Sequence, residues 1–456
     1  MNSSQIAVLG FGKTGQAMLE FLLVHEPRVS VVLFNDSEIA DTERQQFFAG
    51  RGVRFLIGAE KFGELGACRS VIMSPGFDGT TPRFSALRAQ GVEVISEIEF
   101  AFSRIHAKII AVSGSNGKST TVSLIHHLLL QAGRKSVLAG NIGIPFIAQA
   151  GDVADESLVV LELSSFQLEE IIHFRAHVAV LLNITPDHLD RYPSMAAYAA
   201  AKFNLFKNQQ PGDCMVLNAD DPWLRNEKRP GPAKALWFSS TCIPGDGAVL
   251  ESRDIILHSG TAKEKISLRH NPLRGIHNLE NIMAAALACR AVGLTAVEIE
   301  SGLTSFQGLP HRMEAAGKVG RVEFINDSKA TNVDAALKSI ASIQGRLVVI
   351  LGGKDKGSDF TVLEKPLLDK ARKVLLLGKA APLIAAQLPG LKDRLANVSD
   401  FHEAVQSGYD ILRQSGGVVL LAPACASFDM FTNFEHRGEV FKREVQRLRE
   451  RERKNG

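Results

Sequence analysis

The chain has 456 residues and a formal net charge of +3 at pH 7, with 45% hydrophobic and 22% charged residues. These proportions are typical of a globular protein in water, and the length predicts roughly two to four domains. The small net charge argues against a nucleic-acid-binding surface. No apolar run approaches the roughly 18–20 residues of a membrane span, and the N-terminus lacks the pattern of a secretory signal.

The five cysteines are scattered, odd in number and without C-x-x-C spacing. They are Cys68, Cys214, Cys242, Cys289 and Cys425. This pattern favours reduced thiols in a cytoplasmic protein. Cys425 lies in a Pro-Ala-Cys-Ala-Ser segment and could act as a nucleophile, but we expect a small buried residue there.

The first predicted unit is a strand, a glycine turn and an amphipathic helix. The strand covers 6–10, the turn Gly-Phe-Gly-Lys-Thr-Gly covers 10–15, and the helix runs to about residue 23. A second strand over 29–34 ends at Asn35-Asp36-Ser37. This arrangement, with an acid about 20 residues after the glycines, matches the dinucleotide fingerprint and indicates a ligand with phosphates or a ribose. A purely structural glycine turn is the alternative. Further strands are predicted over 54–57 and 70–73, the latter followed by Ser-Pro-Gly76.

A second glycine loop, Gly114-Ser-Asn-Gly117-Lys118-Ser-Thr, follows the apolar run 108–112 and precedes a helix predicted to end near 132. The glycines let the backbone turn its N–H groups toward phosphate oxygens, and the helix N-terminus attracts the same anion. Lys118 can reach the terminal phosphates. The spacing departs from the common phosphate loop because Val112 stands where glycine is expected, so a fortuitous Gly/Ser turn is the alternative. We predict binding of a nucleoside triphosphate and transfer of its γ-phosphate.

Polar clusters follow the next two predicted strands, 158–161 and 178–182, where ligands bind in open α/β sheets. Glu162 belongs to the first cluster, and His188 belongs to the second, which spans 183–191. Since both clusters end neighbouring strands, Glu162 and His188 could meet at one cation. For His188 alone, a hydrogen-bonded loop histidine is the alternative.

A third unit begins near residue 311, and strand–helix alternation continues to a charged helix predicted from about residue 441. Its strands are predicted over 322–325, 347–351, 374–377 and 418–421. Further polar clusters lie at 275–281, 308–314, 326–332, 352–359 and 422–434. The alternation predicts an α/β protein with parallel sheets covered by helices on both faces.

These motifs together resemble the Mur ligase family, over essentially the whole chain from Gly10 to Phe441. The resemblance rests on segments 114–120, 141–145, 161–168, 183–191, 277–278, 308–314 and 326–332. Segments 162–168, 326–332 and 424–434 are similar to the branch that adds D-glutamate. The family implies three domains: a UDP-binding Rossmann-like domain (1–96), a central P-loop-type ATPase domain with a parallel sheet (97–310), and a C-terminal Rossmann-like domain that binds the amino acid (311–456).

The resemblance also implies the site residues, which fall into five groups. The UDP-sugar-binding residues are Gly12, Thr14, Asp36, Ser37, Gly76, Asn141, Ser164, Gln167 and His188. The ATP-binding residues are Gly114, Ser115, Asn116, Gly117, Lys118, Ser119, Thr120, Asn278, Asn281, Arg312 and Asp327. The glutamate-binding residues are Lys329, Thr331, Lys356, Ser427 and Phe434. Two Mg²⁺ ions are implied on Ser119, Glu162, His188 and a carbamylated Lys202, and the catalytic residues are Lys118, His188 and Lys202.

The implied activity is ATP-dependent amide-bond formation through an acyl phosphate, which adds D-glutamate to UDP-N-acetylmuramoyl-L-alanine in cytoplasmic peptidoglycan precursor synthesis. We expect a monomer that binds small molecules, without nucleic acid or membrane insertion. An L-glutamate-adding or other Mur-type ligase stays open, because both enantiomers of glutamate carry the same carboxylates. Folylpolyglutamate synthesis, an NAD(P)-dependent oxidoreductase and a non-catalytic nucleotide sensor are the other readings.

Overall fold

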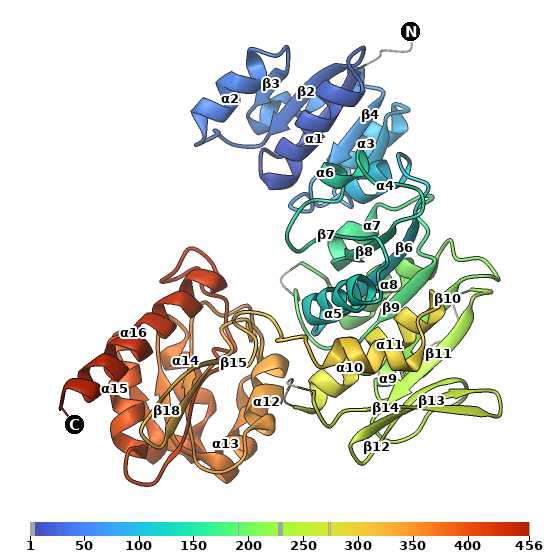
Figure 1. Cartoon of the computed structure of the whole chain (residues 1–456). Helices are drawn as coiled ribbons and strands as arrows, with labels where there is room; N and C mark the ends of the chain where they lie inside the picture. Colours follow the sequence, from blue (N-terminus) through green and yellow to red (C-terminus); the bar gives the residue numbers. More distant parts are fainter. Residues whose placement is uncertain (1–4, 190, 227–230, 272, 274, 456) are drawn as a thin grey trace. The chain divides into compact units, whose positions relative to one another are not determined.

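We describe a computed structural model of the chain, which covers every residue except 1–4, 190, 227–230, 272, 274 and 456 (Figure 1). The chain divides into two compact units. The first comprises Met1–Ile184, Ala196–His270 and Asn281–Thr304, and the second comprises Thr185–Met195, Asn271–Glu280 and Ser305–Gly456. Among the described residues we find no helix with the length and apolar content that a membrane crossing requires.

The first unit opens with a five-stranded parallel sheet in the order β3-β2-β1-β4-β5. Its strands are β1 (Gln5–Leu9), β2 (Ser30–Asn35), β3 (Arg54–Ile57), β4 (Ser70–Met73) and β5 (Glu93–Ser96). Its helices are α1 (Lys13–His25), α2 (Thr42–Ala49), α3 (Pro82–Ala89), α4 (Glu97–Phe102) and the 3-10 helix η1 (Ala59–Ala67). The order changes direction at β1, so the crevice between the carboxyl ends of β1 and β4 is the place where such sheets bind ligands.

The glycine turn after β1 is required by close packing. Gly10 has φ +89°, a backbone conformation that residues other than glycine seldom adopt. A Cβ on Gly15 would lie 1.8 Å from the carbonyl oxygen of Gly10, so α1 can approach the turn only without a side chain there. The glycine pattern predicted at 10–15 therefore has a structural basis as well as a predicted ligand-binding role.

The same unit contains a nine-stranded sheet in the order β14-β13-β12-β11-β10-β9-β6-β8-β7. Its strands are β6 (Lys108–Ser113), β7 (Ser136–Gly140), β8 (Leu158–Glu162), β9 (Val178–Leu181), β10 (Cys214–Asn218), β11 (Lys234–Ser239), β12 (Gly247–Glu251), β13 (Asp254–Ser259) and β14 (Ala262–Ser267). The helices are α5 (Lys118–Gln131), α6 (Ile147–Ala150), α7 (Ser165–Glu169), α8 (Met195–Phe203), η2 (Asn204–Phe206), α9 (Pro222–Asn226), α10 (Ile276–Ala291) and α11 (Ala296–Leu303). Strands β6–β12 pair in parallel, whereas β13 and β14 form an antiparallel extension.

Helix α4 connects the two sheets of the first unit through buried carboxylates. Glu97 Oε1 accepts a hydrogen bond from the Ile147 N–H (2.7 Å) at the start of α6. Glu99 accepts hydrogen bonds from the consecutive backbone N–H groups of residues 172–174, at 2.7–2.9 Å. Both glutamates are nearly fully buried, so these backbone donors are satisfied without water.

The second unit is built on a six-stranded sheet in the order β15-β16-β20-β17-β18-β19. Its strands are β15 (Glu314–Val319), β16 (Val322–Asn326), β17 (Leu347–Leu351), β18 (Ala371–Leu376), β19 (Leu395–Asn397) and β20 (Gly417–Leu421). The helices are α12 (Val333–Ser342), η3 (Thr361–Leu363), α13 (Glu364–Lys370), α14 (Ala381–Gln387), η4 (Pro389–Arg394), α15 (Phe401–Leu412) and α16 (Phe434–Asn455). Only the β15–β16 pair is antiparallel among the described strands of this sheet.

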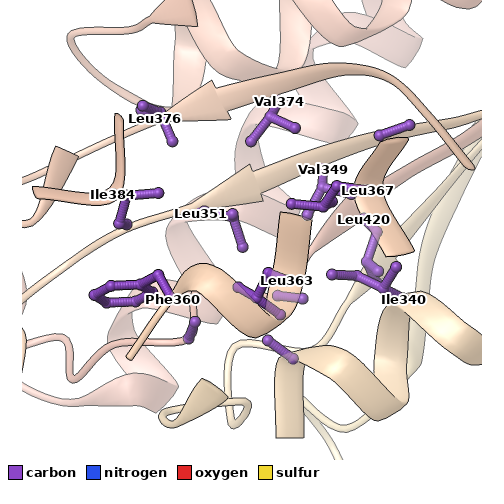
Figure 2. Packing of buried hydrophobic residues seen from close by; sticks show 14 of the residues in the cluster. Ile340, Val349, Leu351, Phe360, Leu363, Leu367, Val374, Leu376, Ile384 and Leu420 are labelled. Carbon is purple, nitrogen blue, oxygen red and sulfur yellow. The ribbon is translucent and has the colours of Figure 1, made fainter. Parts of the chain in front are cut away.

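One face of this sheet packs against α12, α13 and α14 in a core of aliphatic side chains (Figure 2). Val349 and Leu351 of β17 and Leu420 of β20 are fully buried there. Figure 2 shows their side chains facing Ile340 and Leu363 from the covering helices. These strands are apolar at nearly every position because both faces of the sheet are covered.

The strand predictions are confirmed over 54–57, 70–73 and 347–351, where the bounds match those of β3, β4 and β17. The terminal helix was predicted from residue 441, but α16 begins at Phe434, so that prediction is wrong at its start. Several residues of 434–440 are polar and make hydrogen bonds or ion pairs, as Arg437 and Glu439 do. This first part of the helix therefore shows no apolar periodicity in the sequence.

The buried carboxyl of Glu97 gives the fold a pH dependence. Burial raises its pKa from 4.5 to about 7, and the hydrogen bonds from the backbone at 146–147 only partly offset this rise. Between about pH 4.5 and 7 the unfolded chain ionises this group while the folded chain still holds the proton. The free energy of unfolding therefore falls as pH rises through this range.

We expect Glu97→Gln to gain stability relative to the parent chain as pH rises from 5 to 8. Urea denaturation at both pH values measures the difference in unfolding free energy. Glu93→Gln, at an exposed position at the start of β5, is the control and should show a difference that does not depend on pH. A pH-independent difference for Glu97→Gln as well would contradict the assignment.

Candidate active site

The loop Gly114–Gly117 joins the buried strand β6 to the N-terminus of α5. Gly114 has φ +147° and Gly117, the N-cap of α5, has φ +89°. Lys118, Ser119 and Thr120 form the first turn of the helix, where the backbone N–H groups and the helix dipole favour an anion. The loop therefore has the geometry of a phosphate site despite Val112.

The two loop glycines have no room for a side chain. A Cβ on Gly114 would lie 3.0 Å from Leu182 Cβ, and one on Gly117 would lie 2.3 Å from Asn281 Oδ1. Asn281 itself comes from α10 and also contacts Thr121 Oγ1 at 3.3 Å. The structure thus brings Asn281, a predicted ATP-binding residue, against the phosphate loop.

Asn183 and Tyr198 contact the loop, and neither was predicted as a site residue. Asn183 Oδ1 accepts a hydrogen bond from the Asn116 N–H (2.8 Å), and its Nδ2 donates to the Asn116 carbonyl (3.1 Å). The Asn183 carbonyl accepts from the Ser115 N–H (3.0 Å), and the Ser115 hydroxyl contacts the Tyr198 hydroxyl (3.0 Å). Asn183 lies two positions after the end of β9, and this position just after a strand was the available signal.

Two lysine ammonium groups converge on the loop. Lys118 Nζ donates to the carbonyls of Gly114 (2.7 Å) and Ser115 (3.0 Å). Lys202 Nζ, from α8, donates to the same Gly114 carbonyl (2.9 Å) and lies 4.7 Å from the Tyr198 ring centre. Lys202 is 1% exposed. The loop therefore carries concentrated positive charge in a buried setting, which suits a polyphosphate.

Glu162 ends β8 and has one carboxylate oxygen that is not satisfied by the protein. Its Oε1 accepts a hydrogen bond from Asn141 Nδ2 (2.8 Å), which brings together two predicted site residues. Its Oε2 is buried and has no hydrogen-bond partner in the described structure. A buried carboxylate oxygen without a partner costs free energy, which a cation would recover, so the residue fits the predicted Mg²⁺ site.

Ser164 and Gln167 follow Glu162 and form the capping box of α7. The Ser164 hydroxyl donates to Gln167 Oε1 (2.9 Å) and accepts from the Gln167 N–H (3.3 Å). This pairing holds the start of α7 beside the end of β8. Their predicted contact with a UDP-sugar stays a prediction, since the capping box accounts for the geometry that we observe.

The predicted uridine site lies at the carboxyl edge of the first sheet. Gly12 is the N-cap of α1, and Thr14 lies in its first turn. Asp36, just after β2, forms a bidentate ion pair with Arg83 of α3 at 2.7 and 3.0 Å. The other predicted residues, Ser37 after β2 and Gly76 after β4, lie near the same edge. Arg83 was not predicted.

The second unit contains a cavity of about 450 Å³ whose lining includes Asp187, His188, Thr331 and Lys356. The carboxylate of Asp187 lies close to two basic side chains of the lining: it is 3.9 Å from Lys356 Nζ and 3.7 Å from His188 Nε2. Asn332 Nδ2 donates to Asp187 Oδ2 at 3.3 Å. The structure thus brings together His188 with two of the predicted glutamate-binding residues.

Other predicted residues of this unit lie just after its strands or at the start of α16: Asp327 and Lys329 follow β16, and Phe434 begins α16. Asp327 is buried, accepts from the Met313 N–H (3.3 Å) and the Ser339 hydroxyl, and burial raises its pKa. Lys329 Nζ lies 3.9 Å from the ring centre of Phe434. Two further predicted site residues are Arg312, which lies just before β15, and Ser427, which lies after β20.

Cys425 is 1% exposed, and burial raises the pKa of its thiol to about 12. A thiol with that pKa stays protonated at neutral pH, so the expected small buried residue is confirmed. Cys68 and Cys289 are also buried, Cys214 is half-buried, and Cys242 is exposed.

Some predicted groupings cross the boundary between the two units. Lys202 belongs to the first unit and His188 to the second, so their shared Mg²⁺ ion stays a prediction. The boundary also falls within α10, between Asn278 and Asn281, which were predicted to bind ATP together. Asp190, in the His188 cluster, lies outside the described residues.

Three family models match successive parts of the chain. The model described as Mur ligase MurD-like, N-terminal domain, matches residues 4–96. The Mur ligase middle domain matches residues 112–289, and the Mur ligase, glutamate ligase domain, matches residues 311–425.

Curated relatives match over nearly their full length. The chain is 39% identical to the UDP-N-acetylmuramoylalanine–D-glutamate ligase of Alkaliphilus oremlandii, over 98% of the chain and 99% of the relative. It is 40% identical to the enzyme of the same name from Solibacter usitatus, over 97% of each. Among solved structures, a pseudomurein peptide ligase type C from Methanothermus fervidus aligns over 97% of the chain with a TM-score of 0.62 at 17% identity. The UDP-N-acetylmuramate-alanine ligase of Thermotoga maritima aligns with a TM-score of 0.58 at 18% identity, and both structures support the fold.

The crowding at Gly117 predicts a loss of nucleotide binding in Gly117→Ala. The added methyl would lie 2.3 Å from Asn281 Oδ1 in a backbone conformation that alanine disfavours, so the Asn281 side chain or the loop must shift. We expect at least about tenfold weaker binding of an ATP analogue, measured by isothermal titration calorimetry.

Gly133→Ala is the matched control, because Gly133 has φ +69° but no atom within 4 Å of an added Cβ. It carries similar backbone strain at the other end of α5 and should keep its affinity for the nucleotide. Equal affinities in all three proteins would contradict the role of the loop.

Proposed function

Because the chain belongs to the Mur ligase family, we propose that it joins D-glutamate to UDP-N-acetylmuramoyl-L-alanine and converts ATP to ADP and phosphate. The observation that carries this proposal is the full-length likeness to D-glutamate ligases, combined with a glycine loop against which the side chains of Lys118 and Lys202 converge. The reaction belongs to the synthesis of peptidoglycan precursors.

The first chemical obstacle is repulsion between the acceptor carboxylate and the γ-phosphate. Two unit charges 4 Å apart repel by about 4 kcal/mol at an effective dielectric constant of 20. Lys118 at the start of α5 and the N–H groups of the first turn offset this repulsion and stabilise the phosphoryl group in transfer. The attack forms an acyl phosphate and releases ADP, which leaves the acceptor carbonyl electrophilic.

Glu162 and Ser119 would hold a Mg²⁺ ion next to the loop, and Glu162 Oε2 is the available oxygen ligand. When bound, Mg²⁺ supplies positive charge that neutralises phosphate oxygens. We further propose that Lys202 is carbamylated, which would turn the buried ammonium into a carboxylate ligand for a second ion together with His188.

The second step is attack by the amine of glutamate on the acyl phosphate, after which phosphate leaves from a tetrahedral intermediate. The amino acid is proposed to bind in the second unit, with Lys356 and Ser427 at its carboxylates and Lys329, Thr331 and Phe434 around it. His188 is the candidate for removal of the amine proton, since it lies beside Asp187 in the cavity. Holding both substrates in place lowers the entropic cost of the encounter.

UDP is proposed to occupy the carboxyl edge of the first sheet, at Gly12, Thr14, Asp36, Ser37 and Gly76. The sugar and peptide would extend toward Asn141, Ser164, Gln167 and His188. ATP would also be bound by residues near the ends of helices and strands, namely Asn278, Asn281, Arg312 and Asp327. We also propose that the protein is a monomer and acts in the cytoplasm. The proposed domain limits are 1–96, 97–310 and 311–456.

An L-glutamate-adding ligase is the second candidate, because lysine and serine side chains recognise the carboxylates of both enantiomers. An NAD(P)-dependent oxidoreductase would use the glycine turn at Gly10–Gly15 but leaves the Lys118 loop without a function. Binding of NADH would support that alternative.

The decisive experiment is phosphate release from ATP in the presence of UDP-N-acetylmuramoyl-L-alanine, with D-glutamate and L-glutamate tested separately. We expect release with D-glutamate only. Release with L-glutamate alone would keep the mechanism and change the amino acid, and no release with either would contradict the ligase function.

Lys118→Ala should abolish turnover, since it removes an ammonium group that the loop directs at the phosphates. Binding of the UDP-sugar, measured by calorimetry, should persist because Lys118 lies on the loop after β6 and not on the first sheet. Lys108→Ala, at the exposed opposite end of β6, is the control and should retain activity. Wild-type rates in Lys118→Ala would overturn the assignment.

A further inference from the structure

Arg437, in the first turns of α16, is a fully buried side chain that the reaction described above does not use. It is 2% exposed and ranks among the largest buried residues of the described chain. Its guanidinium makes three hydrogen bonds: Nε donates to Ser328 Oγ (2.9 Å), Nη1 to the Cys425 carbonyl (3.0 Å) and Nη2 to the Ser328 carbonyl (2.7 Å). Every partner is a hydroxyl or a backbone carbonyl.

The charge of Arg437 is not neutralised by an ion pair among the described residues, although Asp429 lies near enough to favour the charged form. Burial lowers the pKa of the guanidinium to about 10, so it is still protonated at neutral pH. A buried cation of this kind is costly, and an apolar side chain of similar volume would stabilise a core at least as well. A role in stability alone therefore does not explain an arginine here.

The partners of Arg437 adjoin the residues proposed to bind glutamate. Ser328 precedes Lys329, and Cys425 lies two positions before Ser427. The Ser328 hydroxyl also donates to the carbonyl of Phe434 (2.8 Å), so one guanidinium and one hydroxyl connect three separate chain segments. These segments follow β16, follow β20 and begin α16.

A fourth segment, which carries Lys354 and Lys356, pairs with the segment that contains Cys425. Lys354 and Ala426 exchange backbone hydrogen bonds of 2.8 and 3.0 Å, which joins the loop of Lys356 to the segment of Cys425. Gly353 allows this close approach, since a Cβ there would lie 2.2 Å from the Ala426 carbonyl oxygen and 3.1 Å from Arg437 Nη1. Gly353, three positions before Lys356, therefore lies beside the buried guanidinium.

We propose that Arg437 is a positioning residue that fixes the four segments carrying Lys329, Lys356, Ser427 and Phe434 at one mutual spacing, and thereby sets the affinity for the amino-acid substrate. This inference rests on the proposed function, because it takes glutamate as the occupant of the second unit. Lys329 Nζ already lies over the Phe434 ring, an arrangement that depends on Ser328 and the start of α16 keeping their places.

The planar guanidinium is suited to this task because its donors point in fixed directions. It reaches Ser328 with two nitrogens and Cys425 with a third. An ammonium group at the same place offers donors from one nitrogen atom only, so lysine can restore the charge and part of the bonding but not the spacing.

The test is steady-state kinetics of Arg437→Met and Arg437→Lys in the full-length chain. We expect KM for D-glutamate to rise at least tenfold in Arg437→Met, while KM for ATP and for UDP-N-acetylmuramoyl-L-alanine stays within twofold. Arg437→Lys should fall between the parent chain and the methionine variant. Arg449→Met, at an exposed position on the same helix, is the matched control and should leave all three constants unchanged.

An equal rise of all three KM values, a loss of kcat with KM for D-glutamate unchanged, or no change at all would overturn the proposal. If Arg437→Met does not fold, Ser328→Ala replaces it, since it removes the Nε acceptor and the bond to the Phe434 carbonyl while keeping the buried charge. We then expect a rise of at least threefold in KM for D-glutamate alone, and an unchanged KM would equally overturn the proposal.

The parent chain separates this inference from the function on which it rests. A parent chain that forms no amide with D-glutamate contradicts the proposed function and the inference together. A parent chain that forms the amide, with variants that keep its KM for D-glutamate, contradicts the inference alone.

Discussion

The carbonyl group of Gly114 is the point on which the nucleotide-binding region depends. It accepts hydrogen bonds from both Lys118 Nζ and Lys202 Nζ, so it draws two ammonium groups to one place. Gly114 has a positive φ beside Leu182, where a Cβ has little room, so glycine is favoured at this position. This carbonyl therefore fixes where the ends of both lysine side chains lie.

The two units handle buried charge in different ways. In the first, Glu162 leaves an oxygen without a partner and so retains capacity for a ligand. In the second, the guanidinium of Arg437 directs its donors at the protein's own backbone and organises loops. One buried charge keeps an oxygen available for a ligand among the described residues, and the other holds backbone segments together.

The sequence allowed prediction of features that depend on local pattern. Apolar runs such as those of β4 and β17 are buried on both faces, and the glycine loop before α5 has the expected form. Strand β14 could not be predicted, because Lys263 and Glu264 are exposed and only its antiparallel pairing with β13 makes it a strand. The role of Arg437 arises from contacts between distant segments, which no spacing along the chain reveals, whereas the place of Asn183 just after a strand was a usable signal.

The unequal burial of the five cysteines has a practical consequence for work with reagents. Cys68, Cys289 and Cys425 are shielded, and burial raises the pKa of each thiol, so electrophiles meet little thiolate there. Cys242 is exposed on the loop after β11. The unmodified chain therefore carries its own attachment point for a dye or a surface. Alkylating compounds that inhibit it through Cys425 would first have to open the core of the second unit.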